Sequence, residues 1–194
     1  MNLKSGLPFW LIQSGLPFDY PKLDRSFQTD VLIIGGGISG ALAGYHLSNA
    51  GVPCAIVDAR EIGMGSTSAS TSLLQYELDM PLHKLKGLIG NDKAVRTYEL
   101  CAEAVRKLKT IAGDIGLEEF KTKKSLFFAA DKNDVKLLKD EYDIKKKNKF
   151  DVHFLEEKEI IKKFNFSAPA AILSDTAGEI HDQNWRIMPR NASP

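Results

Sequence analysis

Three glycines with fixed spacing are the first residues in this sequence that could do chemistry. Gly35, Gly37 and Gly40 form the pattern G-x-G-x-x-G, directly after the nearly all-apolar run Asp30–Ile34. This pattern binds dinucleotides when it lies between a buried strand and a helix. Gly35 would permit a tight turn, Gly37 would let the backbone approach a pyrophosphate, and Gly40 would allow close helix–strand packing. We therefore predict a phosphate-binding turn at residues 35–40.

A carboxylate at the end of the next apolar run supports this prediction. Asp58 follows Cys54–Val57 and lies 18 residues after Gly40. At that distance a carboxylate accepts hydrogen bonds from ribose hydroxyls, while free N–H groups at the helix start receive the phosphates. The alternative is a tight turn without a ligand, followed by a surface acid. Because the glycines and Asp58 agree in spacing, the sequence favours a dinucleotide site.

The residues after Asp58 favour FAD over NAD. Residues 60–76 are rich in Gly, Ser and Thr and are predicted to form a loop. In an NAD-dependent enzyme, which is the alternative, a further helix and strand would follow the second strand soon. A long loop of small polar residues can instead extend along the dinucleotide and offer hydroxyl and N–H groups to the phosphates and the flavin. A plain solvated loop is the other interpretation of the same residues.

At this point the sequence resembles the FAD-dependent oxidoreductases related to D-amino-acid oxidase, glycine oxidase and sarcosine oxidase. The residues that show the resemblance are Asp30–Gly40, Ala55–Arg60 and Gly63–Asp79. The resemblance implies a flavin that takes a hydride equivalent from the carbon next to an amine. The substrate would be a small amine or amino acid, oxidised at its C–N bond, and O2 or another acceptor would reoxidise the flavin.

The resemblance also implies a set of cofactor-binding residues. Asp58 would bind the adenosine ribose, and Arg60 would lie near the adenine. Because this chemistry rests on the cofactor, we assign no catalytic acid or base, and we expect no metal site. The full set comprises Gly35, Gly37, Ile38, Ser39, Gly40, Asp58, Ala59, Arg60, Gly65, Ser66, Thr67, Ser68 and Thr71.

The elements that must position these residues predict an α/β fold. It is a Rossmann-like FAD-binding βαβ fold followed by the start of a mixed α+β substrate domain. Asp30–Ile34 is expected to be buried on both faces of a parallel sheet. The helices expected are Ala41–Asn49, a short one opened by Pro81, Asp92–Ile115, Asn133–Lys147 and Glu156–Phe164. The strands expected after Cys54–Val57 are Ser125–Ala130, Val152–Leu155 and Ala170–Ser174.

Four segments are predicted along the chain. Residues 1–28 form an irregular N-terminal arm, 29–80 the FAD-binding βαβ unit and flavin loop, 81–180 the segment leading into the substrate domain, and 181–194 an irregular tail. The aromatic residues Phe9, Trp10, Phe18 and Tyr20 are expected to hold the arm against the body of the protein.

The tail does not continue the pattern that the resemblance leads us to expect. Residues 181–189 have no helical periodicity, whereas another reading frame of the same codons permits a family-like helix. We interpret the tail as frameshifted near His181, and the chain as a truncated N-terminal portion. The alternative to an active oxidoreductase is therefore a non-catalytic dinucleotide-binding remnant.

Composition excludes several other classes of protein. The formal net charge is +1, which gives no electrostatic basis for binding nucleic acid or an anionic membrane. The run Lys145–Lys147 has acidic neighbours and is interpreted as a solvated helix end. The sequence has 2 cysteines and no stretch of about 18 apolar residues, so we predict no disulfide framework and no membrane span. We expect a cytoplasmic protein.

Overall fold

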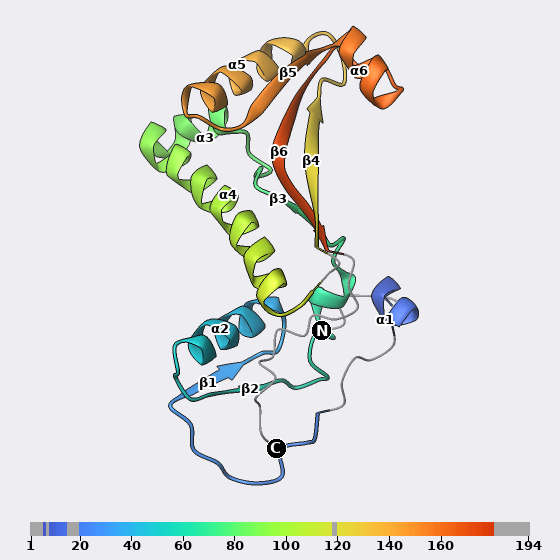
Figure 1. Cartoon of the computed structure of the whole chain (residues 1–194). Helices are drawn as coiled ribbons and strands as arrows, with labels where there is room; N and C mark the ends of the chain where they lie inside the picture. Colours follow the sequence, from blue (N-terminus) through green and yellow to red (C-terminus); the bar gives the residue numbers. More distant parts are fainter. Residues whose placement is uncertain (1–5, 7, 15–19, 118–119, 181–194) are drawn as a thin grey trace. The chain divides into compact units, whose positions relative to one another are not determined.

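The computed structural model describes residues 6, 8–14, 20–117 and 120–180, which divide into two compact units (Figure 1). Unit 1 runs up to Thr71 and includes Ile115–Leu117; unit 2 comprises Ser72–Asp114 and the described residues up to Ile180. The predicted frameshifted tail, residues 181–194, lies outside the described residues, and so does Phe18.

Unit 1 contains the predicted βαβ unit. Strand β1 (Val31–Ile34) pairs in parallel with β2 (Cys54–Val57), with Val31 opposite Cys54 and Ile34 opposite Val57. Helix α2 (Ile38–Asn49) connects the two strands. Parallel strands joined by one helix are the Rossmann-like unit expected from the sequence. Unit 1 also contains the short helix α1 (Phe9–Ser14) and the 3₁₀ turn η1 (Ser66–Ala69).

Two glycines on α2 let this helix lie close to the strands. A Cβ atom on Gly40 would overlap the carbonyl oxygen of Gly35, and one on Gly44 would lie 2.9 Å from Cδ1 of Ile56. The side chains of Ile33 and Ile56 therefore pack beneath the glycine face of the helix. This is the packing role that the third glycine of the motif has in dinucleotide-binding turns.

The expectation that β1 is buried on both faces was wrong. Leu32 is 50% exposed and Ile34 is 84% exposed, whereas Ile33 faces α2. Side chains alternate along a strand, so one helix can cover only every second residue of β1. In the described part of unit 1, β1 is therefore buried on one face only.

Unit 2 is built around one long central strand. Strand β6 (Ala170–Ile180) pairs antiparallel along one edge with β4 (Phe120–Phe128). Its other edge pairs with β3 (Leu73–Gln75) at residues 177–179 and with β5 (Val152–Glu156) at residues 170–174. All three shorter strands are thus held in register by β6.

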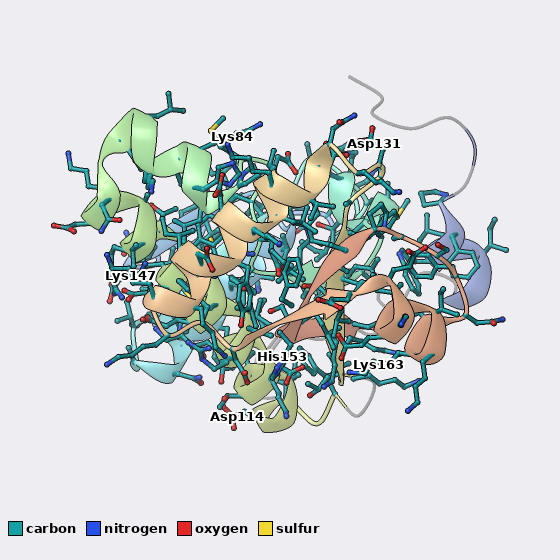
Figure 2. All side chains as sticks on the ribbon, turned by 90° about the horizontal axis from the view of Figure 1, so that it is seen from above. Lys84, Asp114, Asp131, Lys147, His153 and Lys163 are labelled. Atoms are coloured by element: carbon teal, nitrogen blue, oxygen red, sulfur yellow. The ribbon has the colours of Figure 1, made fainter. Side chains whose placement is uncertain are left out.

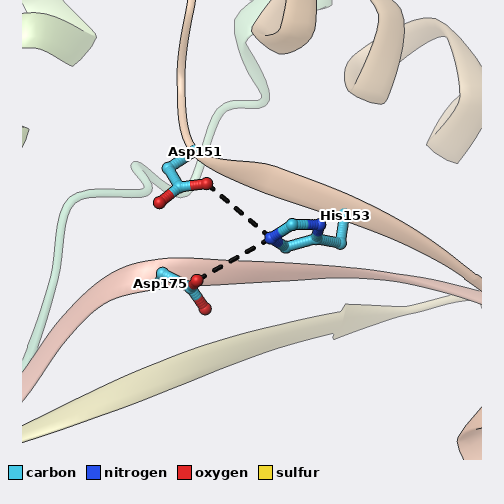
Figure 3. A group of neighbouring side chains, drawn as sticks. All are labelled: Asp151, His153 and Asp175. Carbon is cyan, nitrogen blue, oxygen red and sulfur yellow. Dashed lines mark ion pairs between the residues drawn. The ribbon is translucent and has the colours of Figure 1, made fainter.

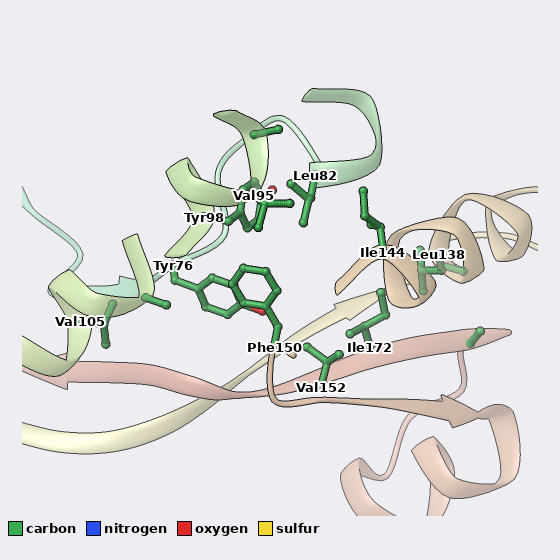
Figure 4. Close-up of a cluster of buried hydrophobic side chains, with 14 residues drawn as sticks. Tyr76, Leu82, Val95, Tyr98, Val105, Leu138, Ile144, Phe150, Val152 and Ile172 are labelled. Atoms are coloured by element: carbon green, nitrogen blue, oxygen red, sulfur yellow. The ribbon is translucent and has the colours of Figure 1, made fainter. Parts of the chain in front are cut away.

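Helices cover the two faces of this sheet differently. Helices α3 (Leu82–Ile89), α4 (Asn91–Asp114) and α5 (Asp134–Lys147) pack on one face, and α6 (Glu157–Phe164) packs on the other (Figures 1 and 2). The main core lies under the first group. Figure 4 shows its large members, which include Tyr76, Leu82, Tyr98, Leu138, Phe150 and Ile172.

The interpretation of Lys145–Lys147 as a solvated helix end was wrong for Lys145. Its side chain is 1% exposed, and its Nζ lies 3.4 Å from Glu141 and 5.1 Å from the centre of the Tyr76 ring. Glu141 is equally buried and accepts hydrogen bonds from the N–H groups of Leu82 and His83 at the start of α3. Sequence proximity offered only Glu141, four positions before Lys145; the amides that hold Glu141 in place lie 58 and 59 positions away from it.

Several element bounds also differ from the sequence predictions. β4 begins at Phe120 and not at Ser125. Its charged first half has no apolar alternation that would predict a strand, and its strand conformation is stabilised by pairing with β6. β6 extends beyond Ser174 to Ile180. The predicted loop 60–76 contains η1 and β3, and the predicted irregular arm contains α1.

None of the helices in the described ranges combines the length and the apolar character that crossing a membrane requires. Cys54 and Cys101 are both free thiols.

Candidate functional site

The turn between β1 and α2 has the geometry of a phosphate-binding turn. Gly35 has a φ of +109°, a conformation that favours glycine, and its N–H donates to the carbonyl of Val57 at 2.7 Å. The N–H of Ala41 donates to the carbonyl of Gly37, which is the first hydrogen bond of α2. The helix itself therefore does not use the preceding amides of Ser39 and Gly40. Such amides, together with the helix dipole, attract an anion.

Gly37 is not required by the fold of this turn. Its φ of −77° and ψ of −174° suit any residue, and a Cβ atom there would meet only Oγ1 of Thr67, at an ordinary 3.4 Å. It lies directly before α2, without a side-chain cap. Because neither backbone conformation nor packing explains the glycine, the open space in front of the helix is the feature that fits a ligand.

Asp58 is tied to the same turn. Its carboxylate accepts hydrogen bonds from the N–H of Gly36 at 2.7 Å and from the N–H of Arg60 at 2.9 Å. Partial burial raises the pKa of this carboxyl, but the backbone N–H groups of Gly36, Arg60 and Ala59 and the charge of Arg60 outweigh burial and hold the pKa below its ordinary value. An ionised carboxylate has about four acceptor positions, so these backbone groups do not use all of its capacity and a ribose hydroxyl can still donate to it.

The polar loop, by which we mean residues 61–71, returns to the start of α2. The N–H of Gly63 donates to the carbonyl of Gly36 at 3.0 Å, and Oγ1 of Thr67 accepts from the N–H of Ile38 at 3.2 Å. Ser68 is buried, and its hydroxyl donates to the carbonyl of Gly65. The loop thus places a hydroxyl at the helix start, next to Gly37.

An open groove of about 1200 Å³ runs along β2 to the end that bears Asp58. Asp58, Ala59 and Arg60 line one end of it, and Tyr20 and Phe27 from the N-terminal arm line it as well. Its volume and the Asp58 carboxylate at one end suit the adenosine portion of a dinucleotide.

The structure brings most of the predicted site residues together, with differences in detail. Gly35–Gly40, Asp58 and Thr67 meet at one turn. Ser66 and Thr71 are exposed on the polar loop. Sequence reasoning missed Ile62, whose side chain fills the space beside Gly36. The one signal for it was a large apolar residue within a run of small ones.

A group of possible metal ligands lies apart from this turn, in unit 2. Asp151, His153 and Asp175 each offer one ligand atom, and these atoms lie within 4.8 Å of one another (Figure 3). His153 lies 3.7 Å from each carboxylate, and Lys124 lies 2.8 Å from Asp175. Asp175 has a pKa below its ordinary value, chiefly because of Lys124. We interpret the group as a surface ion-pair network.

Comparison with known proteins decides the family. A family model described as FAD dependent oxidoreductase matches residues 30–191. The chain belongs to this family. The resemblance stated from the sequence is thereby confirmed, and FAD is the family's cofactor. The predicted α/β fold class is confirmed as well.

Two proteins are similar to parts of this chain. A Bacillus subtilis protein named as a Rieske 2Fe-2S iron–sulfur protein, YhfW, is 26% identical over 136 residues, which cover 70% of this chain and 26% of that protein. Glycine oxidase of Bacillus licheniformis is 41% identical over 54 residues, 27% of this chain and 15% of that enzyme.

Solved structures of other proteins share the fold. Glycine oxidase from Bacillus cereus superposes with a TM-score of 0.61 at 20% identity, covering 79% of this chain and 40% of that one. L-amino acid deaminase from Proteus vulgaris gives a TM-score of 0.67 at 17% identity, covering 84% and 41%. The chain therefore spans about two fifths of the length of these solved relatives.

Proposed function

We propose that the β1–α2 turn of this chain binds the pyrophosphate of FAD. The observation that supports this most directly is Gly37, a glycine that neither backbone conformation nor packing requires, placed before a helix start with free amides. The N–H groups of Ser39 and Gly40 would face the phosphate oxygens, and Ile38 would hold Thr67 beside them through its own N–H.

The adenosine of FAD would lie toward the end of β2. Asp58 keeps acceptor positions for the ribose hydroxyls, and Ala59 and Arg60 would lie beside the adenine, along the groove that they line. Thr67 would contact the phosphates through the hydroxyl that it holds at the start of α2. Gly65, Ser66, Ser68 and Thr71 would extend the polar loop toward the flavin. In this proposal, residues 29–80 form the FAD-binding unit and 81–180 begin the substrate domain.

We further propose that the protein oxidises the C–N bond of a small amine or amino acid. FAD, when bound, supplies the electron-accepting chemistry, and O2 or another acceptor would then take up the electrons. The residues of this chain would hold and orient the cofactor, and we assign none of them to proton transfer. The kinds of substrate named for relatives, such as glycine oxidase, support this class of reaction. A cytoplasmic location stays a prediction.

The cofactor is tested by titrating the purified 194-residue chain with FAD and with NAD in a calorimeter. We expect FAD to bind more tightly than NAD. Tighter binding of NAD would contradict the assignment.

The reaction is tested on the FAD-loaded chain under anaerobic conditions. Bleaching of the flavin absorbance by one or more of a panel of amines and amino acids would support oxidation of a C–N bond. FAD binding without reduction by any of them would favour the non-catalytic alternative, a module that binds the dinucleotide only.

A further inference from the structure

A side chain from the N-terminal arm is bonded to the polar loop. The indole N–H of Trp10, on α1, donates a hydrogen bond to the carbonyl oxygen of Ser70 at 2.8 Å. The two residues are 60 positions apart in the chain. The aromatic residues of the arm were predicted to hold it against the body of the protein, and Trp10 does so. Phe9 is 64% exposed, and its ring packs edge-on against that of Trp10.

The bond from Trp10 attaches near the end of the polar loop, and a different bond attaches near its start. Near its start, the polar loop is tied to the phosphate-binding turn by the bond from Gly63 to Gly36. Near its end, the N–H of Ser70 donates to the carbonyl of Thr67 at 3.2 Å. The carbonyl of Ser70 in turn accepts the hydrogen bond from the indole N–H of Trp10. Trp10 therefore adds a restraint from outside the loop at its far end.

A short series of bonds links Trp10 to the cofactor turn. Trp10 holds Ser70, Ser70 is bonded to Thr67, and Oγ1 of Thr67 accepts from Ile38 at the start of α2. A loop held at both ends has already lost conformational entropy that FAD binding would otherwise remove. Holding Ser70 thus favours the arrangement in which Thr67 faces the phosphates.

We propose that Trp10 is a positioning residue of the FAD site, acting through the polar loop. This inference rests on the proposed function, because it requires that the polar loop contacts FAD. The same N-terminal arm supports it at the other end of the site, where Tyr20 and Phe27 line the groove beside Asp58. The arm is then part of the cofactor site, although it precedes the dinucleotide-binding motif in sequence.

The test compares Trp10→Phe with Ile12→Ala in the full chain. Phenylalanine keeps an aromatic ring but removes the N–H donor, and Ile12 lies on the same helix with 70% of its side chain exposed. One neutral hydrogen bond corresponds to about a three- to tenfold change in an equilibrium constant. We expect Trp10→Phe to weaken FAD binding by that factor and Ile12→Ala to leave it unchanged. Unchanged binding in Trp10→Phe would overturn the inference.

A double-mutant cycle with Thr67→Val separates positioning from a general effect on stability. If both side chains act on one loop, the combined variant should bind FAD more tightly than the product of the two single losses predicts. The visible circular dichroism of bound FAD should also change in Trp10→Phe at saturating cofactor. Additive losses with an unchanged flavin spectrum would show that Trp10 only stabilises the fold, and would refute the inference. Failure of the unmodified chain to bind FAD would instead contradict the proposed function itself, and the inference with it.

Discussion

Replacement of Gly37 by alanine tests the central argument, because the structure lets its effects on folding and on binding be separated. The added Cβ would lie 3.4 Å from Oγ1 of Thr67, an ordinary contact, at a φ of −77° that alanine adopts freely. Loss of glycine before α2 costs about 0.5–1 kcal/mol, and the smaller entropy of the unfolded chain offsets about 0.4–1 kcal/mol. The free energy of unfolding should therefore change by less than about 1 kcal/mol.

Binding should respond far more strongly. A methyl group in front of the helix start would displace at least one charge-assisted hydrogen bond to the pyrophosphate, which contributes about 1.5–3 kcal/mol. That loss corresponds to about a 10- to 150-fold weaker affinity for FAD. Gly37→Val, with a larger side chain, should remove detectable binding while most of the fold remains.

The assay pairs a calorimetric titration with FAD and a thermal melt of the same sample. Gly113→Ala is the matched control, since Gly113 lies in α4 with open space around its Cβ position, and it should leave FAD binding unchanged. Gly40→Ala should behave in the opposite way and disrupt folding, because its Cβ would overlap the carbonyl of Gly35. A folded Gly37→Ala variant that binds FAD within twofold of the unmodified chain would refute the reasoning.

Two further predictions concern charged side chains. Because the pKa of Asp58 is lowered in the folded state, its contribution to stability is fully present above its ordinary pKa of about 4 and is lost as the pH falls through the folded value. Asp58→Asn should weaken FAD binding. It should also remove that part of the pH dependence of stability, as measured by thermal melts between about pH 2 and 7. If the variant and the unmodified chain lost stability in acid to the same extent, the assignment to Asp58 would be contradicted. Glu141→Ala should cost about 3–5 kcal/mol in urea unfolding, because Lys145 and the amides of Leu82 and His83 lose a buried partner. A loss below about 1 kcal/mol would show that the site relaxes or admits water.

Sequence reasoning predicted the geometry of the β1–α2 turn because its requirements are local. The tight turn at Gly35 and the close packing at Gly40 follow from rules that concern a few neighbouring residues. Asp58 was found for the same reason, since its distance from the motif is fixed by the length of one helix and one strand. The structure adds the bonds from Gly36 and Thr67 that join these parts.

The features that were missed depend on contacts between distant residues. Lys145 looks like its exposed neighbours in sequence, and only the fold places it between Glu141 and two tyrosine rings. The sequence of the first half of β4 is typical of a charged loop, and only the hydrogen bonds to β6 make it a strand. Ile34 was expected to be buried because parallel sheets are usually covered on both faces. It is exposed, because the residue types of a strand do not determine how many faces of the sheet are covered.

The arrangement of strands around β6 has a consequence for synthesis on the ribosome. β3, β4 and β5 all pair with β6, which is the last of the four to be translated. Leu73 of β3, for example, pairs with Glu179 of β6. The three earlier strands therefore have no ladder partner in β6 until β6 leaves the exit tunnel. During that interval, apolar strand residues such as Phe127 and Phe128 are open to wrong pairings, and non-local ladders of this kind form slowly. In unit 1, β1 and β2 are joined by the single helix α2, so they can form their ladder while unit 2 is still being translated.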